Sequence, residues 1–199
     1  MDYIKINKKR IFITQGDLYL ESFNIEKISD IKRLKHYSQL MALYLEKNKI
    51  SIIESLDHIV NLRKLHLEAN FITDIRGLDS LINLEELELS GNQILKIENL
   101  NHLQKLKGLL LNANKITKIE GLEDLTNLEH LDLANNQIRE IDGIEKLENL
   151  RYLNLSNNQI KEIDLLTNLG NLEVLDISGN PIANLKALES LNNLRQKTI

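Results

Sequence analysis

The amino-acid sequence predicts an α/β fold in which the chain winds into a curved, right-handed solenoid. A parallel β-sheet is expected on the concave face, and short helical or 3-10 segments on the convex face. One observation behind this prediction is a set of leucines spaced 22 residues apart without an insertion: Leu40, Leu62, Leu84, Leu106, Leu128, Leu150 and Leu172. Another is the composition, which is 42% hydrophobic with 4% aromatic residues and no Cys or Trp, so the core must be aliphatic and free of disulfides.

Each 22-residue repeat predicts one strand and one return segment. A repeat reads L-x-x-L-x-L-x-x-N-x-I-x-x-I-x-x-L-x-x-L, with Leu and Ile exchanging, and all 49 apolar positions of the seven repeats are Leu or Ile. The alternation L-x-L is typical of a strand with one buried face, whereas the later spacing of three is typical of a helical or 3-10 turn. Because one repeat cannot bury its apolar edge alone, the repeats are expected to stack around a continuous core.

An asparagine follows the predicted strand in every repeat. Its side-chain amide can donate to and accept from the backbone of adjacent turns, so the column predicts a hydrogen-bonded ladder inside the stack. We interpret these asparagines as structural residues: Asn48, Asn70, Asn92, Asn114, Asn136, Asn158 and Asn180.

The chain is expected to form a single domain in which residues 1–39 cap the solenoid. Leu18 lies 22 residues before Leu40 and is therefore expected to open a degenerate first repeat. Glu21 and Glu26 then occupy a Leu position and the Asn position, which is typical of a terminal repeat. Further upstream, the apolar residues near the N-terminus predict one or two strands that cover the open end of the core.

The rest of the domain consists of seven regular repeats, at 40–193, and a truncated last strand, at 194–199. Lys197 stands where the repeat has an apolar residue, and no recognisable C-terminal cap follows. An uncovered strand edge invites pairing. The sequence leaves open whether Lys197 itself prevents such pairing, whether a partner or a second copy covers the strand, or whether the natural chain is longer.

Three runs of sequence resemble a particular class of repeats. They are IENL at 97–100, KIEGLEDLTNL at 118–128 and LDLANNQI at 131–138. These runs resemble the 22-residue class of leucine-rich repeats, as found in regulatory subunit 7 of protein phosphatase 1. The resemblance covers residues 18–199. It implies a leucine-rich-repeat horseshoe that serves as an interaction scaffold or a regulatory subunit.

Internalin-type bacterial adhesins also carry 22-residue repeats, and they give the alternative interpretation, an extracellular recognition protein. Their repeats usually have Pro before the return-segment Leu. This sequence has other residues there: Ser55, Gly77, Asn99, Gly121, Gly143, Leu165 and Ala187. Because the N-terminus also lacks the pattern of a secretory signal, the sequence favours a cytoplasmic protein.

The positions that the repeat leaves variable lie between and after the strand leucines, where side chains face solvent on the concave side. Acidic residues outnumber basic residues there, and a few aromatic and apolar side chains lie among them. Tyr can bury its ring while its hydroxyl stays paired, which suits an interface anchor. The sequence therefore predicts docking of a partner protein that has a basic patch. The candidate contact residues are Tyr44, His66, Glu86, Glu88, Leu110, His130, Asp132, Tyr152, Val174 and Asp176.

Other classes of function are disfavoured. A net charge of −4 argues against nucleic-acid binding, and no apolar run approaches the roughly 20 residues that cross a membrane. His66 and His130 face the same side but lie three strands apart, roughly 14 Å at the usual strand spacing, which is too far to share a metal ion. No nucleotide-binding glycine motif or catalytic triad is evident, so we expect no enzyme activity and no cofactor.

Overall fold

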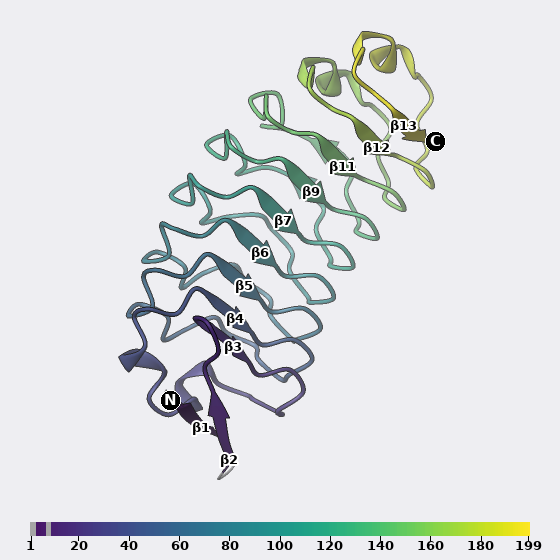
Figure 1. Cartoon of the computed structure of the whole chain (residues 1–199). Helices are drawn as coiled ribbons and strands as arrows, with labels where there is room; N and C mark the ends of the chain where they lie inside the picture. The colour runs from purple at the N-terminus through teal and green to yellow at the C-terminus, as the bar shows by residue number, and fades with distance from the viewer. Residues whose placement is uncertain (1–2, 7–8) are drawn as a thin grey trace.

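The computed structural model describes residues 3–6 and 9–199, which form one elongated stack of coils (Figure 1). Residues 1–2 and 7–8 of the predicted N-terminal cap lie outside the described residues. Within the described part of the chain, a nine-stranded parallel sheet runs along the stack in the order β13-β12-β11-β9-β7-β6-β5-β4-β3. Its strands are β3 (Asp17–Tyr19), β4 (Ala42–Tyr44), β5 (Lys64–His66), β6 (Glu86–Glu88), β7 (Gly108–Leu110), β9 (His130–Asp132), β11 (Tyr152–Asn154), β12 (Val174–Asp176) and β13 (Gln196–Thr198).

The strand leucines point into the stack because alternate residues of a strand face opposite sides. Leu65 pairs with Leu43 on one side and with Leu87 on the other, and all three are fully buried. The same register holds from β4 to β12, so the Leu and Ile side chains of successive coils form one continuous aliphatic core. All 49 apolar repeat positions are buried except Ile141, Ile182 and Leu185.

The asparagine after each strand forms the predicted ladder. The side-chain oxygen of Asn114 accepts a hydrogen bond from the backbone N–H of Ile94 at 2.9 Å. Its amide nitrogen donates to the carbonyls of Leu89 and Leu111, each at 3.0 Å. Equivalent contacts join each coil to the preceding one along the stack. The prediction of a structural ladder is confirmed, since these amides pair backbone groups that are buried away from water.

A second asparagine ladder, which we did not predict, lies just before the strands. Asn61 donates from its side chain to the carbonyl of Ser38 at 2.8 Å, and the same kind of contact recurs along the stack. Lys105 interrupts this ladder, and its ammonium donates to the side-chain oxygen of Asn83 at 2.7 Å. The other members are Asn127, Asn149, Asn171 and Asn193. The 22-residue spacing of these asparagines is the sequence signal from which this second ladder could have been predicted.

The return segments differ along the stack. Three of those described contain 3-10 helices: η1 (Ile28–Asp30) and η2 (Leu34–His36) lie in the first, and η3 (Asp164–Asn168) and η4 (Lys186–Ser190) lie in the last two. The coils between them turn through single hydrogen bonds of the 3-10 type, such as that from the N–H of Leu81 to the carbonyl of Leu78. Two neighbouring returns also pair as short parallel strands, β8 (Lys118–Ile119) and β10 (Glu140–Ile141). The predicted solenoid with a parallel sheet and 3-10 turns is confirmed.

The residue before the return-segment Leu or Ile adopts a left-handed backbone in the coils that precede η3. Its φ angle is 58° at Ser55, 72° at Gly77 and 70° at Gly121. A proline ring holds φ near about −65°, so Pro does not fit this turn. The absence of Pro therefore agrees with the geometry of the turn at Ser55, Gly77, Asn99, Gly121 and Gly143, whereas Leu165 and Ala187 do not adopt this conformation.

Strands β1 (Tyr3–Ile6) and β2 (Lys9–Phe12) form an antiparallel hairpin at the N-terminal end of the stack (Figure 1). Ile4 and Ile6 of β1 are buried and belong to the same apolar core as the repeats. Because these side chains pack on the first coil, the hairpin shields the end of the core from water.

The first repeat does not keep the 22-residue phase that Leu18 predicted. Leu18 pairs with Leu43, which is the fourth residue of the next repeat and not its first. The side-chain oxygen of Asn48 likewise accepts from the N–H of Ile25, 23 residues earlier, whereas the same contact from Asn70 to Ile50 spans 20 residues. The prediction was wrong because the return segment of this coil, which contains η1 and η2, is one three-residue turn longer than in the regular repeats.

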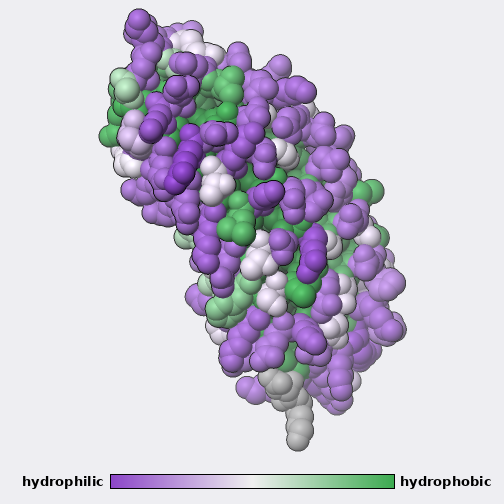
Figure 2. Space-filling view, turned by 180° about the vertical axis from the view of Figure 1, so that it is seen from behind, coloured by the Kyte–Doolittle hydropathy of each residue, from purple (hydrophilic) through white to green (hydrophobic). Residues whose placement is uncertain are grey.

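Strand β13 ends the sheet and pairs with β12. Lys197 occupies the position of a core leucine, and every residue of β13 is exposed. Nearby, Leu185 is 38% exposed and Ile199 is 57% exposed. Figure 2, which views the molecule from behind, shows hydrophobic side chains gathered towards this end, whereas the rest of the visible face is mostly hydrophilic.

Candidate functional site

The open side of the nine-stranded sheet, which we call the sheet face, carries all ten candidate contact residues in two columns that cross the strands. His130 is exposed and the other candidates are half-buried, so each presents part of its side chain to solvent. The first column includes Lys64, Glu86, Gly108, His130, Tyr152 and Val174. The second column includes Tyr19, Tyr44, His66, Glu88, Leu110, Asp132, Asn154 and Asp176.

An aromatic stack occupies the N-terminal end of the sheet face. The rings of Tyr19 and Tyr44 are stacked with their centroids 4.5 Å apart, and the ring of His66 meets Tyr44 edge-on at 4.8 Å. The three rings form a continuous surface across β3, β4 and β5, of the kind that anchors protein interfaces. Tyr19 was missing from the predicted set because the 22-residue phase put another residue beside Tyr44.

His66 is held between two carboxylates. Its Nε2 lies 2.8 Å from Glu86, and its Nδ1 lies 3.4 Å from Glu46. Burial by itself would lower the pKa of His66, but the hydrogen bond with Glu46 and the charge of Glu86 outweigh it, so the pKa lies above its ordinary value.

Glu86 is already paired within the protein. Its carboxylate lies 2.8 Å from the ammonium of Lys64 as well as 2.8 Å from His66. Burial raises the pKa of Glu86, but the hydrogen bond from Lys64 and the charge of His66 outweigh it and hold the pKa below its usual value. A partner therefore gains little additional charge attraction from Glu86.

A second aromatic pair lies in the middle of the sheet face. The rings of His130 and Tyr152 are stacked with their centroids 5.9 Å apart. Leu110 and Asp132 occupy the second column beside them. Burial raises the pKa of the Tyr152 hydroxyl, and the charge of Asp132 adds to this effect. The structure thus brings four of the candidates together, an apolar side chain, two rings and a carboxylate.

Glu88 and Asp132 flank Leu110 in the second column. Burial raises the pKa of both carboxyl groups, and the charges of Glu68 and Asp176 act in the same direction. Neither Glu88 nor Asp132 takes part in an ion pair within residues 3–6 and 9–199. They are acidic groups that a cationic partner can neutralise.

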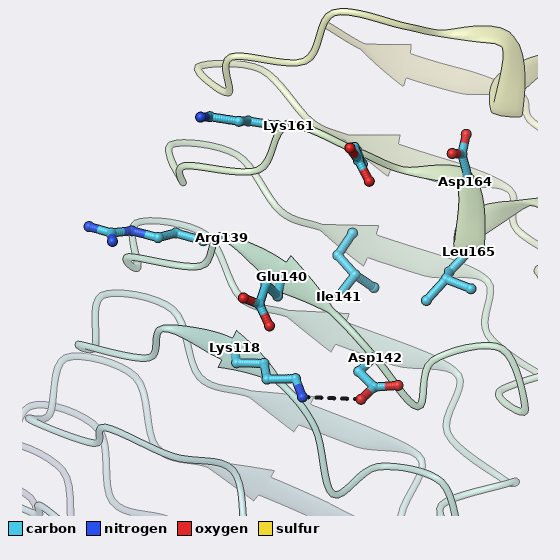
Figure 3. Close-up of a pocket in the computed structure, with 9 residues that line it drawn as sticks. Lys118, Arg139, Glu140, Ile141, Asp142, Lys161, Asp164 and Leu165 are labelled. Atoms are coloured by element: carbon cyan, nitrogen blue, oxygen red, sulfur yellow. Dashed lines mark ion pairs between the residues drawn. The ribbon is translucent and has the colours of Figure 1, made fainter.

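A separate hollow lies among the return segments, where β8 and β10 are followed by η3 (Figure 3). Lys118 lies 3.1 Å from Asp142, and the side chains of Arg139 and Lys161 point away from the hollow. Its lining mixes both signs of charge, and its central pair is open to solvent, with side chains 35% and 57% exposed, where ion pairs contribute little. We therefore do not regard it as a functional site.

Neither a metal site nor a membrane span is found among the described residues. They contain no group of three or more His, Asp or Glu side chains arranged to hold a metal ion. Within the same part of the chain, no helix is long and apolar enough to cross a membrane. His66 and His130 lie on β5 and β9, with β6 and β7 between them, as the sequence predicted.

The family model described as Leucine Rich repeats (2 copies) matches five overlapping stretches of the chain: residues 60–102, 82–124, 104–146, 126–169 and 148–193. Together these stretches cover more than half of the sequence. The chain belongs to the leucine-rich-repeat family. Domains of this family are generally protein-binding scaffolds. No curated protein matches the chain in sequence.

Two internalins of Listeria monocytogenes have similar solved structures. The internalin inlF is 29% identical, with a TM-score of 0.81, and the match covers 88% of this chain and 52% of that one. Internalin C2 is 27% identical, with a TM-score of 0.84, over 92% of this chain and 80% of that one. This leucine-rich-repeat chain therefore spans about half the length of inlF.

A receptor-kinase ectodomain of Arabidopsis thaliana, solved in complex with CASPARIAN STRIP INTEGRITY FACTOR 2, is 26% identical with a TM-score of 0.71. The match covers 83% of this chain and 22% of that one. Nothing in these comparisons supports the finer resemblance to regulatory subunit 7 of protein phosphatase 1, whereas the internalins of the alternative interpretation match most of this leucine-rich-repeat chain.

Proposed function

We propose that this chain is a protein-recognition domain that docks a partner protein with a basic patch on its sheet face. The observation that carries the proposal is the combination of two aromatic groups, Tyr19–Tyr44–His66 and His130–Tyr152, with half-buried carboxylates that have no cationic partner among the described residues. Rings bury a large area at small entropic cost, and unpaired carboxylates select for positive charge.

Of the two interpretations of this docking function, an internalin-like recognition protein is better supported than a scaffold similar to a phosphatase regulator. The structural similarity to inlF and internalin C2 favours it over a phosphatase regulator. The cytoplasmic location, the lack of enzyme activity and the lack of a cofactor remain predictions from the sequence. A secretory signal or a wall anchor in the full gene would favour the extracellular interpretation.

A capture experiment tests the docking surface. The immobilised wild-type chain is compared with a variant that carries Tyr44→Ala, Leu110→Ala and Tyr152→Ala, and captured proteins are identified by mass spectrometry. All three side chains lie on the sheet face and are half-buried, so their loss removes anchors and leaves the fully buried leucines in place. We expect proteins captured by the wild type to be lost with the variant.

The matched control truncates three exposed apolar side chains that lie outside the nine-stranded sheet, Phe71, Ile82 and Leu95. Both variants must show the wild-type circular dichroism spectrum. Retention of the captured proteins by the sheet-face variant, or equal loss with the control, contradicts the proposal.

A further inference from the structure

The sheet face contains a hollow with a volume of about 530 Å³ in its middle. Gly108 explains the hollow, because it is the one position in the first column without a side chain, between Glu86 on β6 and His130 on β9. A Cβ atom added at Gly108 would lie 3.7 Å from the side chain of Glu86, an ordinary contact. A side chain therefore fits here, and the chain instead leaves the space open.

Apolar and aromatic groups form much of the wall of this hollow. Leu110 lies two residues along β7 from Gly108, and the stacked rings of His130 and Tyr152 stand on the far side. Such walls suit an aliphatic stem or a flat, delocalised group, since both bury apolar surface and a cation gains further attraction from an aromatic ring.

Some of the charged side chains that line the hollow are already paired with each other, and one acid remains to bind a partner. Lys64 is paired with Glu86 at 2.8 Å, and Lys107 lies 3.6 Å from Glu85. Asp132 is the remaining acid of the lining, and it has no ion pair among the described residues. The free negative charge of the hollow is therefore concentrated at one carboxylate.

Asp132 is only partly solvated. Its carboxylate is hydrogen-bonded by the N–H of Ala134 at 3.0 Å and by the side chain of Asn154, yet burial outweighs both and raises the pKa of Asp132, and the charge of Asp176 raises it further. The carboxylate is half-buried and has hydrogen bonds but no counter-charge among the described residues, so a cation that reaches it from a partner gains more than it would from a fully solvated acid.

We propose that this hollow is a subsite for one arginine side chain of the docked partner protein. The guanidinium binds the Asp132 carboxylate and lies against the ring of Tyr152, while the aliphatic stem packs on Leu110. Arginine fits better than lysine because its planar group can both stack on a ring and bind a carboxylate with two hydrogen bonds. The inference rests on the proposed docking function and names the chemistry that the sheet face selects.

The test titrates the protein with N-acetyl-arginine N-methylamide and follows the Leu110 methyl and Tyr152 ring resonances by NMR. The corresponding amides of lysine, leucine and glutamate serve as comparison ligands. We expect saturable shifts with arginine, weaker binding of lysine and leucine, and none of glutamate. The absence of a saturable shift overturns the proposal, and so does leucine binding as tightly as arginine.

Two variants locate the site. Gly108→Leu fills the hollow and is expected to weaken arginine binding at least about tenfold. Gly170→Leu is the control, because it adds the same bulk at a glycine where an added Cβ would have no atom within 4 Å. We expect the control to leave arginine binding unchanged. Asp132→Asn keeps an acceptor for Ala134 and removes the charge, so it is expected to weaken binding about tenfold. Arginine binding that survives both substitutions contradicts the assignment.

Unfolding in urea adds a readout that a merely structural Asp132 would not give. Because burial disfavours its charged form, Asp132→Asn is expected to leave the stability at neutral pH unchanged or raised while it weakens binding.

A failure of the subsite is distinguishable from a failure of the docking function. If Gly108→Leu still captures the proteins that the Tyr44, Leu110 and Tyr152 variant loses, the docking surface stands and the arginine subsite does not.

Discussion

The ring of Tyr19 lies parallel to the ring of Tyr44, with 4.5 Å between the centroids and 3° between the planes. This contact joins the capping coil to the first regular repeat on the sheet face. It exists because β3 pairs with β4 in a register that puts Leu18 beside Leu43. The N-terminal cap thereby contributes to the candidate binding surface as well as to the protection of the core.

The first prediction concerns the energy of this stack. In a double-mutant cycle with Tyr19→Ala and Tyr44→Ala, we expect a coupling free energy of about 0.5–1.5 kcal/mol, towards the lower end because Tyr19 is 54% exposed. The free energy of unfolding in urea is the measurement. Additive effects of the two substitutions would show that the rings do not interact in solution.

The second prediction concerns the asparagine ladder. Asn114→Leu removes the acceptor for Ile94 and the donor to Leu89 and Leu111, so buried backbone groups lose their partners. We expect a loss of about 1–3 kcal/mol in the free energy of unfolding. The control is Asn127→Leu, which removes one exposed hydrogen bond and should cost less. Equal effects of the two substitutions would contradict the structural role of the buried ladder.

The third prediction compares two glycines with similar backbone conformations. Gly77 has φ 72°, and an added Cβ would lie 2.3 Å from the carbonyl oxygen of Ile53. Gly91 has φ 64°, but its nearest neighbour would lie at 3.5 Å, and Ala69 and Ala113 occupy the same position in adjacent repeats.

Ser55 and Asn99 have φ 58° at the position of Gly77 in the adjacent repeats, so the strain of Ala at position 77 comes from its contact with the Ile53 carbonyl and not from φ alone. Ala at position 91 meets no such contact and repeats the conformation of Ala69 and Ala113. We expect Gly77→Ala to lower the free energy of unfolding by about 2 kcal/mol or more and Gly91→Ala by less than about 1 kcal/mol. Thermal and urea unfolding measure both. A smaller loss for Gly77→Ala would mean that the return segment shifts to make room.

The fourth prediction concerns the pH dependence of stability through His66. Its pKa in the folded protein lies above the ordinary value of 6.5, despite burial, because of Glu46 and Glu86. Protonated His66 therefore stabilises the fold fully below about pH 6.5, and this contribution is lost as the pH rises through the folded-state pKa. Glu86 stays ionised over this range because its own pKa is lowered.

We expect the difference in unfolding free energy between wild type and His66→Gln to favour the wild type more at pH 6 than at pH 9. An NMR titration of the His66 ring gives the pKa directly, and Glu46→Gln should lower it. A midpoint at or below 6.5 in the wild type would contradict the paired geometry.

The regular part of the fold was predictable because every repeat carries the same signal. The buried side chains from Leu40 to Ile177 follow the 22-residue pattern closely, and the ladder from Asn48 to Asn180 follows from its position after the strand. Departures occur at Ile141, a partly exposed residue of β10 beside the return-side hollow, and at the exposed C-terminal end.

The candidate site was predictable only in part. The alternation of strand residues placed the ten candidates on one face, since the faces of a strand alternate with a period of two. It did not show which candidates meet. The stack of His130 on Tyr152, and the placement of His66 between Glu46 and Glu86, depend on side-chain conformations that a linear pattern does not contain.

The sequence by itself determined the coil, its apolar core and its asparagine ladder, because a strict repeat makes each residue's environment the same in every turn. The tertiary structure alone decided the register of Leu18 against Leu43, the contact of Tyr19 with Tyr44 and the hollow at Gly108. These features depend on how one coil is placed against the next. That placement follows from the length of a return segment and from the presence or absence of a neighbouring side chain, and not from the pattern within one repeat.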